Sequence, residues 1–91
     1  MVKLVEIIKN LSGYQLGEVY INPEHVVAMR PDDRMVSVMK EGLLPEGLNR
    51  AQGFTKLYVD RGHTGIDITV VGDVQHIKEK FGINAKTLLK G

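Results

Sequence analysis

The chain has 91 residues, of which 43% are hydrophobic and 25% charged, and its formal net charge is +1. This length predicts a single domain, 1–91, and the composition excludes wholesale disorder. The small net charge excludes recruitment of DNA or membranes by a global field.

There is no Cys, so disulfides and thiolate metal sites are excluded and a reducing, cytoplasmic setting is expected. No apolar run approaches the roughly 18 residues of a membrane span, and Glu6 and Lys9 interrupt the N-terminal apolar stretch, so no span and no signal peptide are expected.

The first part of the chain predicts a hairpin followed by a short turn. Residues 2–9 are rich in β-branched side chains and predict a strand, although their apolar residues also fit a helical stripe. "NLSGYQLG" supplies turn residues, and residues 19–21 alternate as a strand partner. Asn22 and Pro23 then predict one helical or 3₁₀ turn, because Asn caps helices and Pro suits the first helical position.

Four further extended segments are expected. "VVAM" continues to "RPDD", where Pro and Asp mark a turn. Residues 34–40, 54–60 and 66–71 alternate between two faces, so each predicts a strand.

The clearest predicted helix follows the last of these strands. Asp73 stands at an N-cap position, and Val74, Ile77 and Phe81 lie three and four residues apart on one face. Gly82 is suited to end the helix.

Residues 84–90, "NAKTLLK", predict one last short turn, with Leu88 and Leu89 packing back. The pattern as a whole predicts a small α+β domain. It would be a small antiparallel sheet or partly closed barrel of about five strands with a C-terminal helix.

The segment "DRGHTG", residues 60–65, gathers polar side chains that could suggest catalysis. Gly62 and Gly65 bracket His63 and Thr64 between two alternating strands, which predicts a tight hairpin with a residue or two at positive φ. The histidines lack metal-ligand spacing, the serines lack a nucleophile-elbow context, and the glycines form no phosphate loop. We therefore expect no catalytic residue, no metal ligand and no cofactor, and hence no enzyme.

The segment 41–53 is longer than the two to five residues of an ordinary hairpin loop and holds three leucines. Two interpretations stay open. The leucines fold back over an open end of the sheet, or they form an exposed anchor for a protein partner. The candidate partner-binding residues are Leu43, Leu44, Pro45, Leu48 and Arg50.

Basic residues outnumber acidic ones toward the C-terminus, which is typical of a solvated helix face or of a nucleic-acid patch. Aromatic residues are not interleaved with these lysines, which favours the solvated face. The alternative candidate nucleic-acid-binding residues are Arg30, Arg34, Lys78, Lys80 and Lys86.

The stretch "VYINPEHVVAMRPDDRMVSV", residues 19–38, resembles the small flagellar accessory proteins of the FlbD/SwrD family. The shared features are an Asn that ends a strand, apolar residues spaced as Val26 and Met29, and Pro-Asp before the next segment. "ITVVGDVQHIKEKF" is similar to the closing strand and helix of that family, and similar patterns occur in short uncharacterised phage and bacterial proteins. The 41–53 segment and the "DRGHTG" hairpin depart from the family pattern. The resemblance implies a non-catalytic bacterial or phage β domain.

Three function hypotheses follow. The first is a protein-binding accessory module that self-associates through exposed strand edges or docks on a larger assembly. The alternative is a nucleic-acid-binding β domain that uses the lysine-rich face. The third, an enzyme, has the least support in the sequence.

Overall fold

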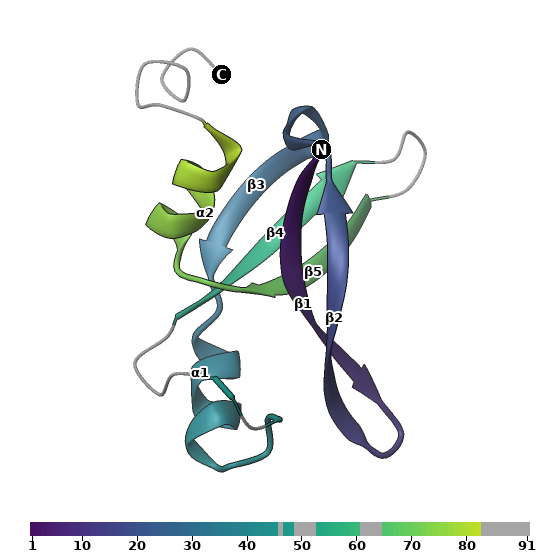
Figure 1. The fold of residues 1–91 in the computed structure, drawn as a ribbon, viewed down its shortest axis with the longest axis vertical. Helices are drawn as coiled ribbons and strands as arrows, with labels where there is room; N and C mark the ends of the chain where they lie inside the picture. Colours follow the sequence, from purple (N-terminus) through teal and green to yellow (C-terminus); the bar gives the residue numbers. More distant parts are fainter. Residues whose placement is uncertain (46, 49–52, 61–64, 83–91) are drawn as a thin grey trace.

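A computed structural model describes residues 1–45, 47–48, 53–60 and 65–82, and these form an α+β fold with a five-stranded antiparallel sheet (Figure 1). The strands are β1 (Val2–Asn10), β2 (Gly13–Ile21), β3 (Val26–Pro31), β4 (Phe54–Asp60) and β5 (Gly65–Val71). The helices are the 3₁₀ turn η1 (Pro23–His25) and the α-helices α1 (Asp33–Lys40) and α2 (Val74–Phe81). The order across the sheet is β2-β1-β5-β4-β3, which confirms the fold class and the small antiparallel sheet.

The sheet is open, so of the two expected alternatives the antiparallel sheet is found and the partly closed barrel is not. β2 and β3 lie at opposite edges of the strand order and do not pair with each other. β1 and β2 pair along their whole length, whereas β1 meets β5 only at Glu6 opposite Val70 and Ile7 opposite Thr69. Beyond this short junction the Asn10–Gly13 end of the hairpin extends away from the other strands, as Figure 1 shows, whereas Leu4 and Ile21 at its other end pack in the common core.

The expectation of a strand at 34–40 is also wrong, because these residues form α1. Asp32 caps this helix, since its side chain accepts a hydrogen bond from the backbone N–H of Met35. Gly42 follows the helix with a φ of +76°, a conformation that suits the end of a helix. Apolar residues at 35, 36, 38 and 39 fit both periods, and the caps at the two ends favour the helix.

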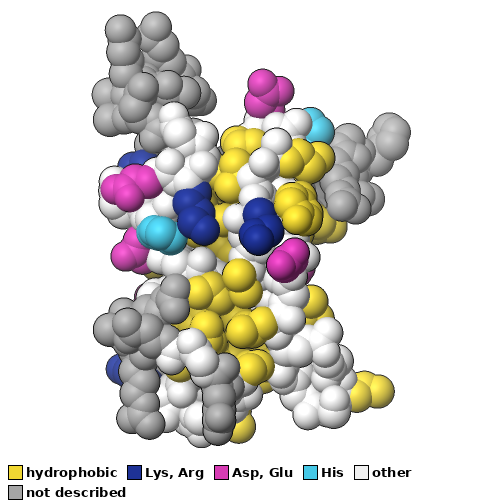
Figure 2. Space-filling model, in the orientation of Figure 1, with side chains coloured by type: hydrophobic (Ala, Val, Ile, Leu, Met, Phe, Trp, Pro, Cys, Tyr) yellow, Lys and Arg dark blue, Asp and Glu magenta, His cyan; other side chains and the backbone are white. Residues whose placement is uncertain are grey.

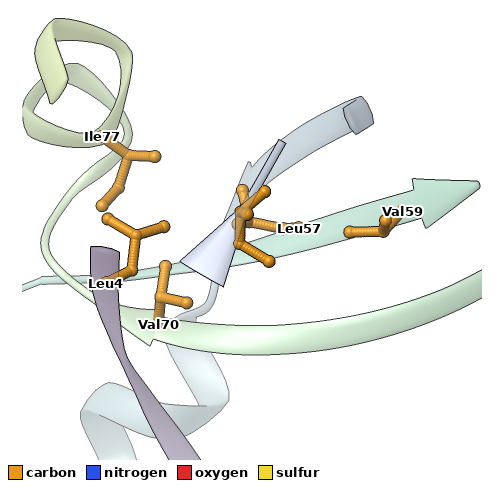
Figure 3. Packing of buried hydrophobic residues seen from close by; sticks show 6 residues of the cluster. Leu4, Leu57, Val59, Val70 and Ile77 are labelled. Atoms are coloured by element: carbon orange, nitrogen blue, oxygen red, sulfur yellow. The ribbon is translucent and has the colours of Figure 1, made fainter. Parts of the chain in front are cut away.

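One face of the sheet, here called the inner face, holds the core and is covered by α2. Figure 3 shows Ile77 pointing from α2 toward Leu4 and Val70. The expected stripe on this helix is confirmed: Ile77 is fully buried, and Val74 and Phe81 are half-buried. The buried residues of the inner cluster are Leu4, Ile21, Leu57, Val59, Val70 and Ile77.

Both ends of α2 are formed as the sequence predicts. The side chain of Asp73 accepts a 2.8 Å hydrogen bond from the backbone N–H of His76. Gly82 takes the left-handed conformation, with a φ of +70°, at the C-cap. The expectation of a single, C-terminal helix is not met, because the described residues also hold α1 in mid-chain.

The opposite face of the sheet, here called the outer face, carries α1. Side chains alternate between the faces along each strand, so Ile7 and Phe54 point away from the inner cluster. Both are nonetheless buried, with 6% and 2% of their surface exposed. The domain therefore has a second, smaller apolar contact beside α1.

The hairpins and η1 agree with the sequence. Asn22 caps η1 by accepting from the backbone N–H of Glu24, and β4 pairs with β5 from Asp60 opposite Gly65 onward. Gly65 is not among the described glycines at positive φ. The rest of the "DRGHTG" tip, residues 61–64, and the expected turn at 84–90 lie outside the described residues. Neither described α-helix is long and apolar enough to span a membrane.

Candidate functional site

β2 is one of the two edge strands of the sheet, and in the described residues it pairs only with β1. Only Leu11 and Ser12 separate the closing pair of the hairpin, Asn10 opposite Gly13. In such a two-residue hairpin the closing pair exchanges both hydrogen bonds, and bonded and non-bonded pairs then alternate along the strands. The odd-numbered residues of β2 therefore bond to β1. The even-numbered residues direct their backbone N–H and C=O groups to the free edge, and they are Tyr14, Leu16, Glu18 and Tyr20.

The other edge of the sheet, β3, carries features that discourage a further strand. It has six residues, ends at Pro31, and has a register irregularity between Val26 and Ala28. Proline and bulges are common protections of edge strands. β2 has nine residues in unbroken register, no proline and one charged side chain, Glu18. Of the two edges, β2 is thus the one suited to strand addition.

The side chains beside this edge are partly apolar. By alternation, Tyr14, Leu16, Glu18 and Tyr20 lie on the outer face, because Val19 and Ile21 pack in the inner cluster. Tyr20 is 58% exposed and Leu16 is 37% exposed. Figure 2 shows that, on the side of the molecule drawn there, hydrophobic side chains lie both above and below the centre, with basic side chains between them.

Two contacts place charged side chains of β1 against this row. Lys3 lies 3.8 Å from Glu18 across the strand pair, and both side chains are mostly exposed. The ammonium of Lys9 lies 6.0 Å from the ring centroid of Tyr14. Exposed pairs of this kind contribute little to stability, at most about 1 kcal/mol each. The row along the edge is therefore mostly apolar, and its one carboxylate, Glu18, lies beside the ammonium of Lys3.

A groove of about 560 Å³ lies between α1 and the outer face. Its charged side chains balance, with three basic and three acidic: Lys9, Arg34, Lys56, Glu6, Asp32 and Asp67. Asp32 is 7% exposed, and both its carboxylate oxygens accept hydrogen bonds, from Met35 and from the Thr69 hydroxyl. These bonds hold α1 against the sheet, so Asp32 has a structural role here.

The polar groups that could support catalysis are dispersed in the described part of the chain. His25 and His76 are both exposed and lie on different elements, η1 and α2. Within those residues no three His, Asp or Glu side chains are close enough to hold a metal ion. His63 lies outside the description.

The loop residues chosen from the sequence lie after α1 and do not form one exposed cluster. Leu43 is 55% exposed and its N–H donates to the carbonyl of Val38, continuing the end of the helix. Leu44, Pro45 and Leu48 are half-buried, and Arg50 lies outside the described residues. A partner-binding role for this loop stays a prediction.

The residues of the nucleic-acid alternative lie on different sides of the sheet. Arg30 lies 5.9 Å from the ring centroid of Tyr58 on the outer face, and Arg34 lines the groove beside α1. Lys78 and Lys80 belong to α2, which covers the inner face, and Lys86 lies outside the described residues. The described members therefore do not form one patch.

Sequence reasoning passed over the β2 edge. Two features of "GYQLGEVYI" could have indicated this edge: it has a single charged residue in nine, and its two tyrosines lie three residues on either side of Gly17. Comparison of the chain with protein-family models, with curated proteins and with solved structures finds no match.

Proposed function

We propose that the protein is a small non-catalytic accessory domain that binds protein by strand addition to the free edge of β2. The observation that carries the proposal is that β2, at the end of the strand order, pairs over nine unbroken residues with β1 and, among the described residues, with no strand on its other side. A strand added there receives main-chain hydrogen bonds from residues 14, 16, 18 and 20. Each bond formed in this way contributes about 0.5–1.5 kcal/mol net.

The side chains of the same residues give the edge its selectivity. Leu16 and Tyr20 offer exposed apolar surface on the outer face, and Tyr14 is half-buried at the groove beside α1. The neighbouring Glu18 already faces Lys3. An added strand with apolar or aromatic side chains on this face gains burial, whereas an acidic strand meets Glu18. Main-chain bonds thus supply affinity, and alternate side chains supply specificity.

The test compares two substitutions of matched exposure. Leu16 on the edge strand and Val5 on the neighbouring β1 are both 37% exposed and lie on the same face. Leu16→Lys places a charge on the free edge, a common device against strand addition, while Val5→Lys places it one strand inward. We expect a Leu16→Lys bait to lose the proteins that wild type and Val5→Lys capture from bacterial lysate, with circular dichroism unchanged in both variants.

Hydrogen exchange of the backbone amides is a second test of strand addition in any captured complex. Strand addition protects the amides of Tyr14, Leu16, Glu18 and Tyr20, and leaves the already bonded odd-numbered amides as they were. Equal capture by both lysine variants, with no new protection at the even positions, would refute the proposal.

A further inference from the structure

We infer that the occupant of the β2 edge is β2 of a second copy of this chain, antiparallel about a two-fold axis at Gly17. This inference rests on the proposed function and names the partner for the same edge. Two-fold dimers use the same patch on both subunits, so the strand must be complementary to itself.

The length of β2 sets the register. Gly17 is the middle residue of Gly13–Ile21, so an axis there pairs the strand with its copy from end to end. Tyr14 then lies opposite Tyr20 of the second copy, and Leu16 lies opposite Glu18 of the second copy. In this register each residue whose backbone N–H and C=O groups point to the free edge lies opposite another such residue of the second copy. The hydrogen-bonding pattern of an antiparallel pair requires this match.

Neighbouring registers are less favourable. A slip of one residue would set outward-directed amides against residues whose amides already bond to β1. A slip of two residues in one direction leaves Tyr20 and Ile21 without partners. In the other direction it sets Glu18 directly against Glu18, and like charges opposite each other are destabilising.

The end-to-end register about Gly17 also brings exposed side chains of the two copies into contact. It forms two Tyr14–Tyr20 cross-strand pairs, and aromatic pairs of this kind are favourable. It covers Leu16 on the outer face and leaves each Glu18 beside its own Lys3, 3.8 Å away. A contact of one strand from each copy is at the small end of protein interfaces, so the dimer forms at high protein concentration.

Gly17 is compatible with the axis because its side-chain position is filled from within the chain. A Cβ at Gly17 would lie 2.6 Å from Cδ1 of Ile8, which occupies that space from β1. A substitution at Gly17 would also move the Ile8 side chain on the inner face, so Gly17 is unsuitable for testing the interface alone.

Disulfide trapping tests the register directly, because the chain has no native Cys. Tyr14→Cys and Tyr20→Cys are purified separately, mixed and oxidised. Hydrogen-bonded antiparallel pairs have Cα atoms about 5.5 Å apart, within the range of a disulfide. We expect the mixed disulfide to form about tenfold faster than a Lys3→Cys homodimer, which reports random collision on the same face.

Two further variants separate the other registers. Leu16→Cys and Glu18→Cys alone would form fast homodimers only if the strands slip by two residues. Faster trapping of either one than of the Tyr14–Tyr20 mixture overturns the register. Trapping of all variants at the Lys3→Cys rate overturns the second copy as occupant.

Sedimentation equilibrium of the unmodified chain completes the test. We expect a monomer–dimer equilibrium that Leu16→Glu shifts to monomer, because it sets a carboxylate opposite Glu18 of the second copy, and that Val5→Lys leaves in place. A chain that stays monomeric, yet still captures lysate proteins in a manner sensitive to Leu16→Lys, contradicts the second-copy inference while the strand-addition proposal holds.

Discussion

The hydroxyl of Thr69 on β5 donates a 2.6 Å hydrogen bond to Oδ2 of Asp32, 37 residues earlier in the chain. Oδ1 of the same carboxylate accepts from the N–H of Met35 in the first turn of α1. The N–H of Asp32 in turn donates to the carbonyl of Phe54 at the start of β4. The buried Asp32 thus caps α1 and connects it by hydrogen bonds to β4 and β5.

Asp32→Ala should therefore destabilise the domain by about 2 kcal/mol or more. Loss of an N-cap costs about 1 kcal/mol, and the buried Thr69 hydroxyl left unpaired costs about 1–3 kcal/mol. Urea unfolding measures the change. Asp33→Ala, at an exposed neighbouring position, is the control and should cost under about 1 kcal/mol. Equal effects of the two substitutions would mean that the Asp32–Thr69 bond does not hold α1.

Ile77→Ala should be among the most damaging changes in α2. Ile77 is fully buried against Leu4 and Val70 (Figure 3), so its truncation should cost about 2–5 kcal/mol. Phe81→Ala should cost less, because Phe81 is only half-buried. Lys80→Ala on the exposed side is the control. A larger loss for Phe81→Ala than for Ile77→Ala in chemical denaturation would argue against this packing of α2.

Gly72→Ala should lower the melting temperature, and Gly65→Ala should change it little. Gly72 has a φ of +120°, and an added Cβ would lie 2.9 Å from Cδ2 of His76 and 3.2 Å from Cδ1 of Ile77. Such strain costs about 1–3 kcal/mol. At Gly65 the nearest atom to an added Cβ is the carbonyl oxygen of Val59, at an ordinary 3.8 Å. A thermal melt that ranks the two alanine variants in the reverse order would contradict these backbone conformations.

The elements predicted well are those whose signals are local. α2 combines a stripe of apolar residues with Asp73 and Gly82 at its ends, and cap and periodicity point to the same structure. At α1 the signals conflict, since its valines and methionines also alternate as in a strand. Its cap, Asp32, is held by Thr69 from a distant strand, and a local pattern does not contain that contact.

The candidate site depends on strand order, which periodicity does not contain. The sequence indicates that β1 and β2 form a hairpin, but the pairing of β1 with β5 leaves β2 at the edge. If β2 were a central strand, the backbone amides of Tyr14 and Tyr20 would already be bonded to a neighbouring strand, and the edge would not be available. The symmetric placement of Tyr14 and Tyr20 about Gly17 is present in the sequence, and it acquires meaning only once that edge is known to be free.

The substitution Leu43→Ser distinguishes partner binding at the β2 edge from partner binding at the 41–53 loop, which the sequence indicated. Leu43 is 55% exposed, so its replacement should change the free energy of unfolding by about 0.5 kcal/mol or less. Its backbone N–H, which donates to the carbonyl of Val38, is retained. We therefore expect Leu43→Ser to keep the dimer that Leu16→Glu loses, as measured by sedimentation. It should also keep the captured proteins that Leu16→Lys loses, as measured by lysate capture. If Leu43→Ser abolishes capture while Leu16→Lys preserves it, the binding surface is the 41–53 loop, because an exposed leucine with no part in the fold would then carry the contact.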